Sequence, residues 1–188
     1  SSRSTFNATV RSSAVSRAGD ILLLAEPASP AERASVQFNW LTEAVLGSPV
    51  AVLLLPARLA RRKGPVVAIA ATEDDPSIQA ATEIAAFLGE DLVILDADHL
   101  EHPLSMREFG DEERLRAERI PAARGALADP TLLHHAFRDL QERLIVMTRG
   151  AFHDWVAPTV ASSRNVPVLL VEQASSAAQF PSEAKAER

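Results

Sequence analysis

The feature that most constrains the fold is a set of short segments that are apolar without interruption. A strand with one face in water alternates apolar and polar residues, whereas an uninterrupted run is typical of a strand buried on both faces. Helical segments lie between the runs, and this alternation favours a parallel sheet. The sequence therefore predicts an α/β protein, an open parallel sheet with helices on both faces. The runs are residues 21–25, 50–55, 66–70, 92–95, 144–147 and 166–171.

Start and stop signals predict helices between these runs. Asp75-Pro76 places an N-cap and a first-turn proline before one helix, and Gly89 is a stop signal for it. Asp129-Pro130 begins a second helix in the same way, and a third is expected from Phe38 to Leu46. The apolar face of the first helix is predicted to consist of Ile78, Ala81, Ile84, Ala85 and Leu88.

Composition narrows the classes of function. The 188 residues include no Cys, which excludes disulfides and thiolate metal sites and is expected of a cytoplasmic protein. The net charge is −6 and there is no Tyr, so we expect no nucleic-acid binding. No apolar run approaches the roughly 20 residues of a membrane span, so no membrane insertion is expected. The sequence begins without Met, as expected of a chain fused to an upstream region.

A strand–loop–helix–strand unit occurs twice in the chain. The first copy runs from Asp20 to Leu54 and the second from Arg143 to Val171. In both copies the last strand follows a proline, Pro49 or Pro167. Such self-similarity indicates an internal repeat. Residues 57–64 lie between the two units and are predicted to be a linker.

The segments from residue 64 to residue 172 resemble the universal stress protein family. The ending Val-Pro-Val-Leu-Leu-Val, residues 166–171, carries much of this resemblance together with the order of the apolar runs. The resemblance implies an adenine-nucleotide-hydrolase-like fold for this part of the chain. Its first strand, first helix start, second strand and short third strand are matched by residues 66–71, 74–77, 92–95 and 119–124.

Residues 5–56 resemble only the back half of another copy of this fold. In that half, residues 5–11 are expected to form the third strand and residues 12–19 a short helix. The resemblance therefore implies a tandem arrangement. Its parts are residues 1–56 as the C-terminal half of one unit, 57–64 as the linker, 65–173 as a complete domain and 174–188 as a flexible tail.

Nucleotide-binding members of the resembled family have an acidic residue at the end of the first strand and a Gly-rich loop after the fourth. Glycines let the backbone approach phosphates, and helix N-terminal N–H groups hold the anion. Here the loop of residues 148–158 contains a single Gly, and Ser162-Ser163 stands near its expected close. In the first copy the loop of residues 26–30 contains no Gly and begins with Glu26. We therefore expect that the protein binds no cofactor. ATP is the candidate whose binding should be tested.

A ligand crevice is nevertheless predicted where the strands end. In open α/β sheets, ligands bind at the carboxyl ends of strands, at the point where the strand order reverses. The alternative is a plain strand-end loop with solvated charges. The residues that we expect at this crevice are Thr72, Glu73, Asp74, Arg149 and Gly150.

No constellation of residues predicts catalysis or a metal site. His99 and His102 lack a third ligand, and His134 and His135 fall on the polar face of their helix. His153 and Asp154 could suggest a catalytic His–Asp pair, but no activated serine nucleophile stands out in the sequence. We therefore predict a non-catalytic sensing, regulatory or interaction module of the stress response, and not an enzyme. The alternative is an adenine-nucleotide-binding stress protein with weak or no ATPase activity.

The last strands of the two units are predicted to lie at sheet edges. Residues 50–55 and 168–171 carry no charge and no Gly, which leaves them open to edge pairing. In the resembled family this strand commonly mediates dimer contact. The pairing would give either a homodimer or an intrachain pseudo-dimer, and tethering favours the latter. The residues expected at this contact are Val50, Val52, Val168 and Leu170.

Overall fold

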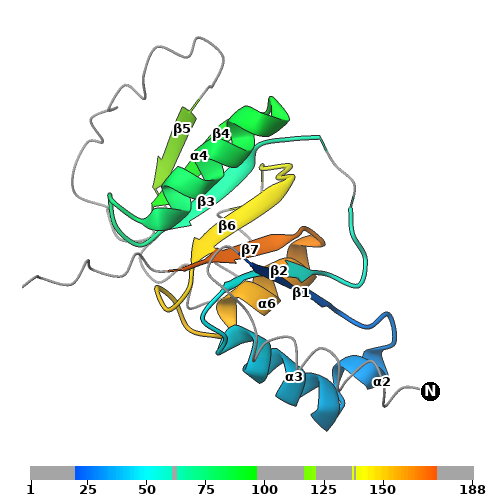
Figure 1. Cartoon of the computed structure of the whole chain (residues 1–188). Helices are drawn as coiled ribbons and strands as arrows, with labels where there is room; N and C mark the ends of the chain where they lie inside the picture. The colour runs from blue at the N-terminus through cyan, green and yellow to red at the C-terminus, as the bar shows by residue number, and fades with distance from the viewer. Residues whose placement is uncertain (1–19, 61–62, 97–116, 122–136, 138, 173–188) are drawn as a thin grey trace, which may run out of the picture.

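Strands from both predicted units join in one sheet. The computed structural model describes residues 20–60, 63–96, 117–121, 137 and 139–172. Within these residues a seven-stranded sheet has the order β1-β2-β7-β6-β3-β4-β5 (Figure 1). The strands are β1 (Ile21–Ala25), β2 (Ala51–Leu55), β3 (Val66–Ala70), β4 (Leu92–Asp96), β5 (Ala117–Pro121), β6 (Leu144–Thr148) and β7 (Val168–Val171). The helices are α2 (Pro30–Arg33), α3 (Val36–Leu46), α4 (Pro76–Leu88) and α6 (Val156–Arg164).

One pair of neighbouring strands in this sheet is antiparallel. β2 pairs with β7 in the antiparallel sense, with Val52 opposite Leu170 and Leu54 opposite Val168. Every other neighbouring pair is parallel. The described strands thus confirm the predicted α/β class and the six strands predicted from the apolar runs. β5 lies at the predicted short third strand and begins two residues earlier than residue 119.

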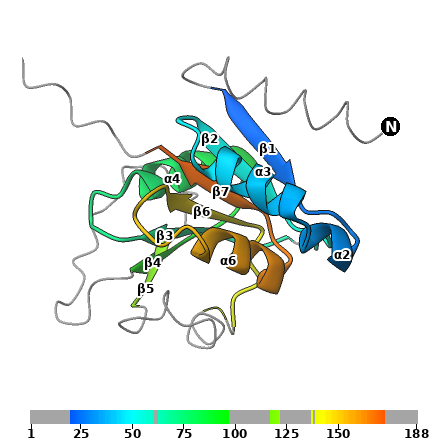
Figure 2. The ribbon, with the colours of Figure 1, turned by 90° about the horizontal axis from the view of Figure 1, so that it is seen from below.

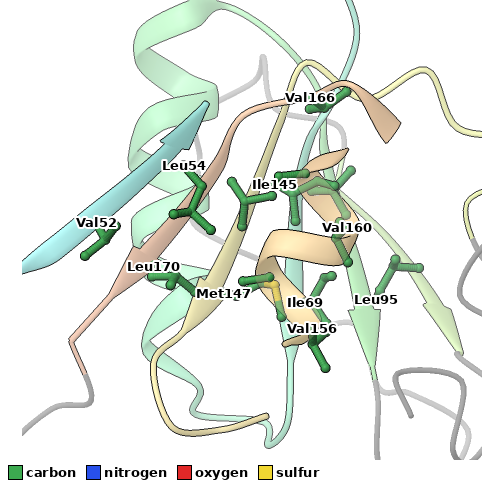
Figure 3. Packing of buried hydrophobic residues seen from close by; sticks show 14 of the residues in the cluster. Val52, Leu54, Ile69, Leu95, Ile145, Met147, Val156, Val160, Val166 and Leu170 are labelled. Carbon is green, nitrogen blue, oxygen red and sulfur yellow. The ribbon is translucent and has the colours of Figure 1, made fainter. Parts of the chain in front are cut away.

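Helices cover the two faces of the sheet unequally. α3 and α6 pack on one face, where their side chains share a core with Val52, Ile145 and Leu170 (Figures 2 and 3). α4 packs on the other face, over Val146 and its neighbours on β3 and β4. The larger core therefore lies under α3 and α6, and it is continuous across the junction between β2 and β7.

The prediction that every apolar run is buried on both faces is wrong for three strands. All residues of β3 and β4 are buried, whereas β1, β2 and β7 alternate between more and less buried positions. For β1 and β2 the reason is the position of α4, which contacts β3, β6, β4 and β7. In β7, Leu169 and Val171 pack against the α4 core but are only partly buried. Among the described helices, none packs on the same face over β1 and β2. Ile21 and Leu23 are therefore 60% and 56% exposed.

The helix signals are confirmed where the structure describes them. Asp75 caps α4 by accepting a hydrogen bond from the Ser77 N–H, and Gly89 ends the helix in the left-handed conformation. α3 begins at Val36, two residues before the predicted start, because Ser35 provides its N-cap. The short helix α2 was not predicted. The expected elements at residues 5–19, the helix beginning at Asp129-Pro130 and the tail at 174–188 lie outside the described residues, apart from residues 137, 139 and 140.

A buried ion pair fixes the C-terminal end of α6. Arg164 Nε donates to Glu142 Oε1 at 2.6 Å, and Glu142 is completely buried. The same guanidinium donates through Nη2 to the carbonyl oxygens of Phe137 and Leu140, both at 3.0 Å. It also lies 5.6 Å from the centre of the Phe137 ring. Arg164 therefore ties α6 to the segment that enters β6.

Gly64 is expected to tolerate no side chain. Its φ is +154°, and an added Cβ would lie 1.8 Å from the carbonyl oxygen of Gln141. We expect Gly64→Ala to lower the free energy of unfolding by about 2 kcal/mol, through backbone strain and this clash. Gly89→Ala is the matched control, because Gly89 also has positive φ but has open space around it. Urea denaturation of both variants tests this, and equal losses would contradict the close approach at Gly64.

Candidate functional site

The predicted crevice lies where the carboxyl ends of β3 and β6 meet. These two strands are parallel neighbours in the sheet. The helix that follows β3 is α4 and the helix that follows β6 is α6, and they pack on opposite faces (Figure 1). This is a topological switch point, the place where open α/β sheets usually bind their ligands.

Side chains of the protein itself bridge this point. The Thr148 hydroxyl donates to the Asp75 carboxylate, which also accepts from the backbone N–H of Ala71 at 2.9 Å. The Ser77 N–H lies 2.9 Å from Asp75 Oδ1 and 3.1 Å from Thr148 Oγ1. Asp75, Ser77 and Thr148 are each at most 5% exposed. The carboxyl ends of β3 and β6 are thus joined by a buried network, which we call the Asp75 bridge.

The Asp75 bridge occupies the Ser77 N–H, the backbone donor that an anion at the N-terminus of α4 would need. A phosphate at a helix N-terminus is held by the free N–H groups of the first turn. At α4 the Ser77 N–H is already bonded to Asp75 and Thr148, and Pro76 has no N–H. The fixed carboxylate of Asp75 would in addition repel a phosphate. The N-terminus of α4 is therefore closed to anionic ligands by the residue that caps it.

Of the five predicted crevice residues, two line a common cavity and three lie in an exposed turn. Thr72, Glu73 and Asp74 lie in an exposed turn after β3. Arg149 and Gly150 line a different space beside β7, a cavity of ≈ 20 Å³ that also contacts Phe152 and His153. A pocket for a small ligand has a volume of roughly 300–1,000 Å³, so this cavity has room for about one water molecule.

Arg149 is directed away from the β3 side of the site. Its Nη2 donates to the carbonyl oxygen of Val50 at the start of β2, and its backbone N–H donates to the Val171 carbonyl at 2.9 Å. Its Nε is buried and has no hydrogen-bond partner among the described residues. Burial lowers the pKa of the Arg149 guanidinium, and the carboxylate of Glu172 opposes this shift. In this arrangement Arg149 braces the junction of β2 and β7.

The loop between β6 and α6 carries three aromatic side chains, one packed inward and two exposed. Phe152 packs against the larger core, and the rings of His153 and Trp155 stack with centroids 6.2 Å apart. The Val156 N–H donates to the His153 carbonyl at 2.9 Å, and Pro158 in the first turn of α6 has no N–H. Few backbone donors therefore remain for a phosphate at the N-terminus of α6.

In the first unit a carboxylate lies at the corresponding strand end. Glu26 follows β1 directly and accepts hydrogen bonds from the Ala57 N–H, at 3.2 Å, and from the Ser162 hydroxyl. Glu26 thus joins the ends of β1 and β2 to α6. Ser162, which the sequence places near the close of the phosphate loop, makes this contact with its hydroxyl.

Sequence reasoning missed the Asp75 bridge, although one of its signals was visible. Asp75 is predicted as an N-cap, but its second role, as acceptor for Thr148, joins residues 73 positions apart.

In the described part of the chain no group of three His, Asp or Glu side chains could hold a metal ion. No helix within the described ranges is long and apolar enough to cross a membrane. His99, His102, His134 and His135 lie outside these ranges.

The comparisons with known proteins identify the fold. No protein-family model and no curated protein matches the sequence. Among solved structures, a protein from Pseudomonas aeruginosa UCBPP-PA14, provisionally described as a universal stress protein, matches with a TM-score of 0.50 and 17% identity. A protein of unknown function from Pseudomonas aeruginosa PAO1 matches with a TM-score of 0.51 and 16% identity. The chain has a universal-stress-protein-like fold.

These matches cover most of this chain and a smaller part of the solved structures. They cover 88% and 89% of this chain, which spans 66% and 67% of the lengths of the two Pseudomonas proteins. A universal stress protein from Archaeoglobus fulgidus is also found, with a TM-score of 0.46 and 14% identity. At such identities the universal-stress-protein-like likeness concerns the arrangement of strands and helices.

Removing the Asp75 carboxylate is expected to destabilise the protein. Asp75→Ala removes the cap of α4 and leaves the Thr148 hydroxyl and the Ala71 N–H without their acceptor. We expect a loss of about 2–3 kcal/mol in the free energy of unfolding, since a lost N-cap and an unsatisfied buried group each contribute about 1 kcal/mol or more. Asp74→Ala, at the exposed neighbouring position, is expected to stay within about 0.5 kcal/mol. Equal urea midpoints for the two variants would contradict a structural role of the Asp75 bridge.

Proposed function

We propose that this protein is a non-catalytic universal stress protein-like module for sensing, regulation or interaction, and that it does not bind ATP. The observation that carries the proposal is the Asp75 bridge. It occupies the N-terminus of α4, at one side of the switch point, with a fixed carboxylate and a bonded N–H group. A phosphate could enter at this helix N-terminus only if the hydrogen bonds of the Asp75 bridge were broken.

Two further observations support the absence of a nucleotide site. The cavity beside Arg149 has a volume of ≈ 20 Å³, far below that of a nucleoside triphosphate. The strand end of the first unit carries Glu26, whose carboxylate is held by Ala57 and Ser162. With no nucleotide and no catalytic constellation in the described residues, we propose that the protein is not an enzyme.

The proposed architecture is a tandem one. Residues 1–56 would be the C-terminal half of one unit and residues 65–173 a complete unit. In support, β1 and β2 pair in parallel with α3 between them in sequence, and β6 and β7 do the same with α6. The antiparallel pairing of Val52 with Leu170 would then be the contact of an intrachain pseudo-dimer.

A second candidate function is that of an adenine-nucleotide-binding stress protein. The observation that favours it is the conformation of Gly150, whose φ is +74° and where an added Cβ would meet open space. With no side chain and open space around it, this backbone is accessible to an approaching anion. The candidate requires the loop after β6 to rearrange, because Phe152 and His153 line the same small cavity.

Thermal unfolding in the presence of ATP, ADP or AMP separates the two candidates. A ligand that binds the native state at a hundred times its Kd stabilises it by about 2.7 kcal/mol, which raises the midpoint by several degrees. We expect no shift with any of the three nucleotides at millimolar concentration. A rise of several degrees that is lost in Gly150→Val would favour the second candidate.

A further inference from the structure

β1 is the outermost strand of the described sheet, and one of its edges has no partner among the described strands (Figure 1). We call this the outer edge of β1. Its sequence, Ile-Leu-Leu-Leu-Ala, contains no charge, proline or glycine. Natural edge strands usually carry such residues, because they block pairing with a further strand. Nothing in the sequence of β1 therefore prevents a further strand from pairing along its outer edge.

The two faces of the sheet differ at this edge. Leu22 and Leu24 lie on the face that α3 covers, which we call the α3 face. Ile21 and Leu23 lie on the opposite face and are 60% and 56% exposed. Side chains alternate between the two faces in every strand of a sheet. A strand that fits beside β1 should therefore alternate apolar residues on the α3 face with polar residues on the opposite face.

The chain contains a segment with this pattern shortly before β1. Residues 1–19 lie outside the described residues and are separated from β1 by Asp20 alone. Within them, residues 5–11 read Thr-Phe-Asn-Ala-Thr-Val-Arg, in which apolar and polar residues alternate without exception. Thr, Phe and Val also favour strands. The apolar positions of this segment are Phe6, Ala8 and Val10.

The length of the connection sets the sense of the pairing. Only residues 12–20 lie between the segment and β1. This is shorter than the dozen or more residues that a crossover between parallel strands needs, whereas antiparallel neighbours need only a turn. Serines and a glycine, which are common turn residues, stand in the connection. The connection therefore favours antiparallel pairing.

We propose that residues 5–11 pair in the antiparallel sense with the outer edge of β1 and place Phe6, Ala8 and Val10 on the α3 face. The occupant of this edge is then a segment of the same chain. β6, the counterpart of β1 in the second unit, also has its equivalent edge covered within the chain, by β3. By occupying the outer edge, the segment would prevent β1 from pairing with a second copy of the chain.

This proposal goes beyond the proposed function and does not depend on it. No observation about nucleotides enters the argument for the outer edge. Detection of ATP binding would contradict the proposed function and leave the experiment below unaffected.

Hydrogen exchange of the full chain tests the pairing. The amides of residues 21–25 that point away from β2 are expected to exchange at least about a hundredfold more slowly than unprotected amides. Phe6→Asp places a charge on the α3 face and is expected to speed this exchange about tenfold or more. Asn7→Asp is the matched control, because it adds the same charge on the opposite face, and should leave the exchange unchanged. Equal protection of the β6 amides in all three proteins will show that the fold is intact.

Four results would overturn the proposal. The first is fast exchange of the outward amides of residues 21–25 in the unmodified chain. The second is protection of these amides that Phe6→Asp leaves unchanged. The third is equal acceleration in Phe6→Asp and Asn7→Asp, which would contradict the placement of Phe6 on the α3 face. The fourth is protection that rises with protein concentration together with a dimer in light scattering, since the occupant would then be a second copy.

Discussion

Arg164→Met is expected to lower the free energy of unfolding by about 3–5 kcal/mol, because it leaves the fully buried Glu142 carboxylate without its cation. The substitution also removes the two donors that Arg164 provides to the Phe137 and Leu140 carbonyls. Urea denaturation measures the loss. Arg143→Met is the matched control, since its ion pair with Glu90 is partly exposed and is expected to contribute only about 0–1 kcal/mol.

A double variant separates the ion pair from the packing around it. Replacing a complete buried pair by apolar residues is often close to neutral, whereas removing one partner is strongly destabilising. Arg164→Met combined with Glu142→Leu is therefore expected to recover a large part of the stability lost in Arg164→Met alone. Equal losses in the single and the double variant would show that the Glu142 charge does not determine the effect.

Val168→Lys is expected to be the second most damaging of these substitutions. Val168 is completely buried, pairs with Leu54 of β2 and with Ile145 of β6, and lies in the larger core. An unpaired lysine there is expected to lower the free energy of unfolding by about 3–4 kcal/mol. Leu23→Lys is the matched control, because Leu23 is 56% exposed and its variant should lose less than about 1 kcal/mol.

Hydrogen exchange tests the same substitution without requiring complete unfolding. β2 is held on one side by β1 and on the other by β7. In Val168→Lys the amides of residues 50–55 should exchange faster, with the largest change at amides that face β7. Unchanged protection of these amides would exclude the pairing of β2 with β7 in solution.

The strands of this fold could be predicted from the sequence because their signal is local. Each apolar run is visible as an uninterrupted segment, and the ends of α4 are set by Asp75 and Gly89, within one turn of the helix. The burial of each face could not be predicted in the same way. Leu23 and Val146 both lie in uninterrupted apolar runs, but a described helix covers Val146 alone. Whether such a helix is present is a tertiary fact that the run itself does not contain.

The candidate site shows the same division between local and tertiary signals. Thr72, Glu73 and Asp74 were expected in the crevice because they follow a strand, yet the turn directs them outward. Asp75, one residue further along, is buried because it caps α4 and accepts from Thr148. Arg149 was expected to face a ligand, but the antiparallel pairing of β2 and β7 brings the Val50 carbonyl within its reach. That carbonyl lies 99 positions away in the sequence, so the spacing of residues around Arg149 could not predict the contact.

Calorimetric titration of the full chain with ATP is the decisive test of the closed switch point. The Asp75 bridge occupies the Ser77 N–H at the N-terminus of α4, and the ≈ 20 Å³ cavity beside Arg149 is too small for a triphosphate. We therefore expect no saturable heat of binding up to millimolar ATP. A Kd in the low micromolar range, equivalent to about −8 kcal/mol, would contradict the proposed function and identify the protein as a nucleotide-binding one.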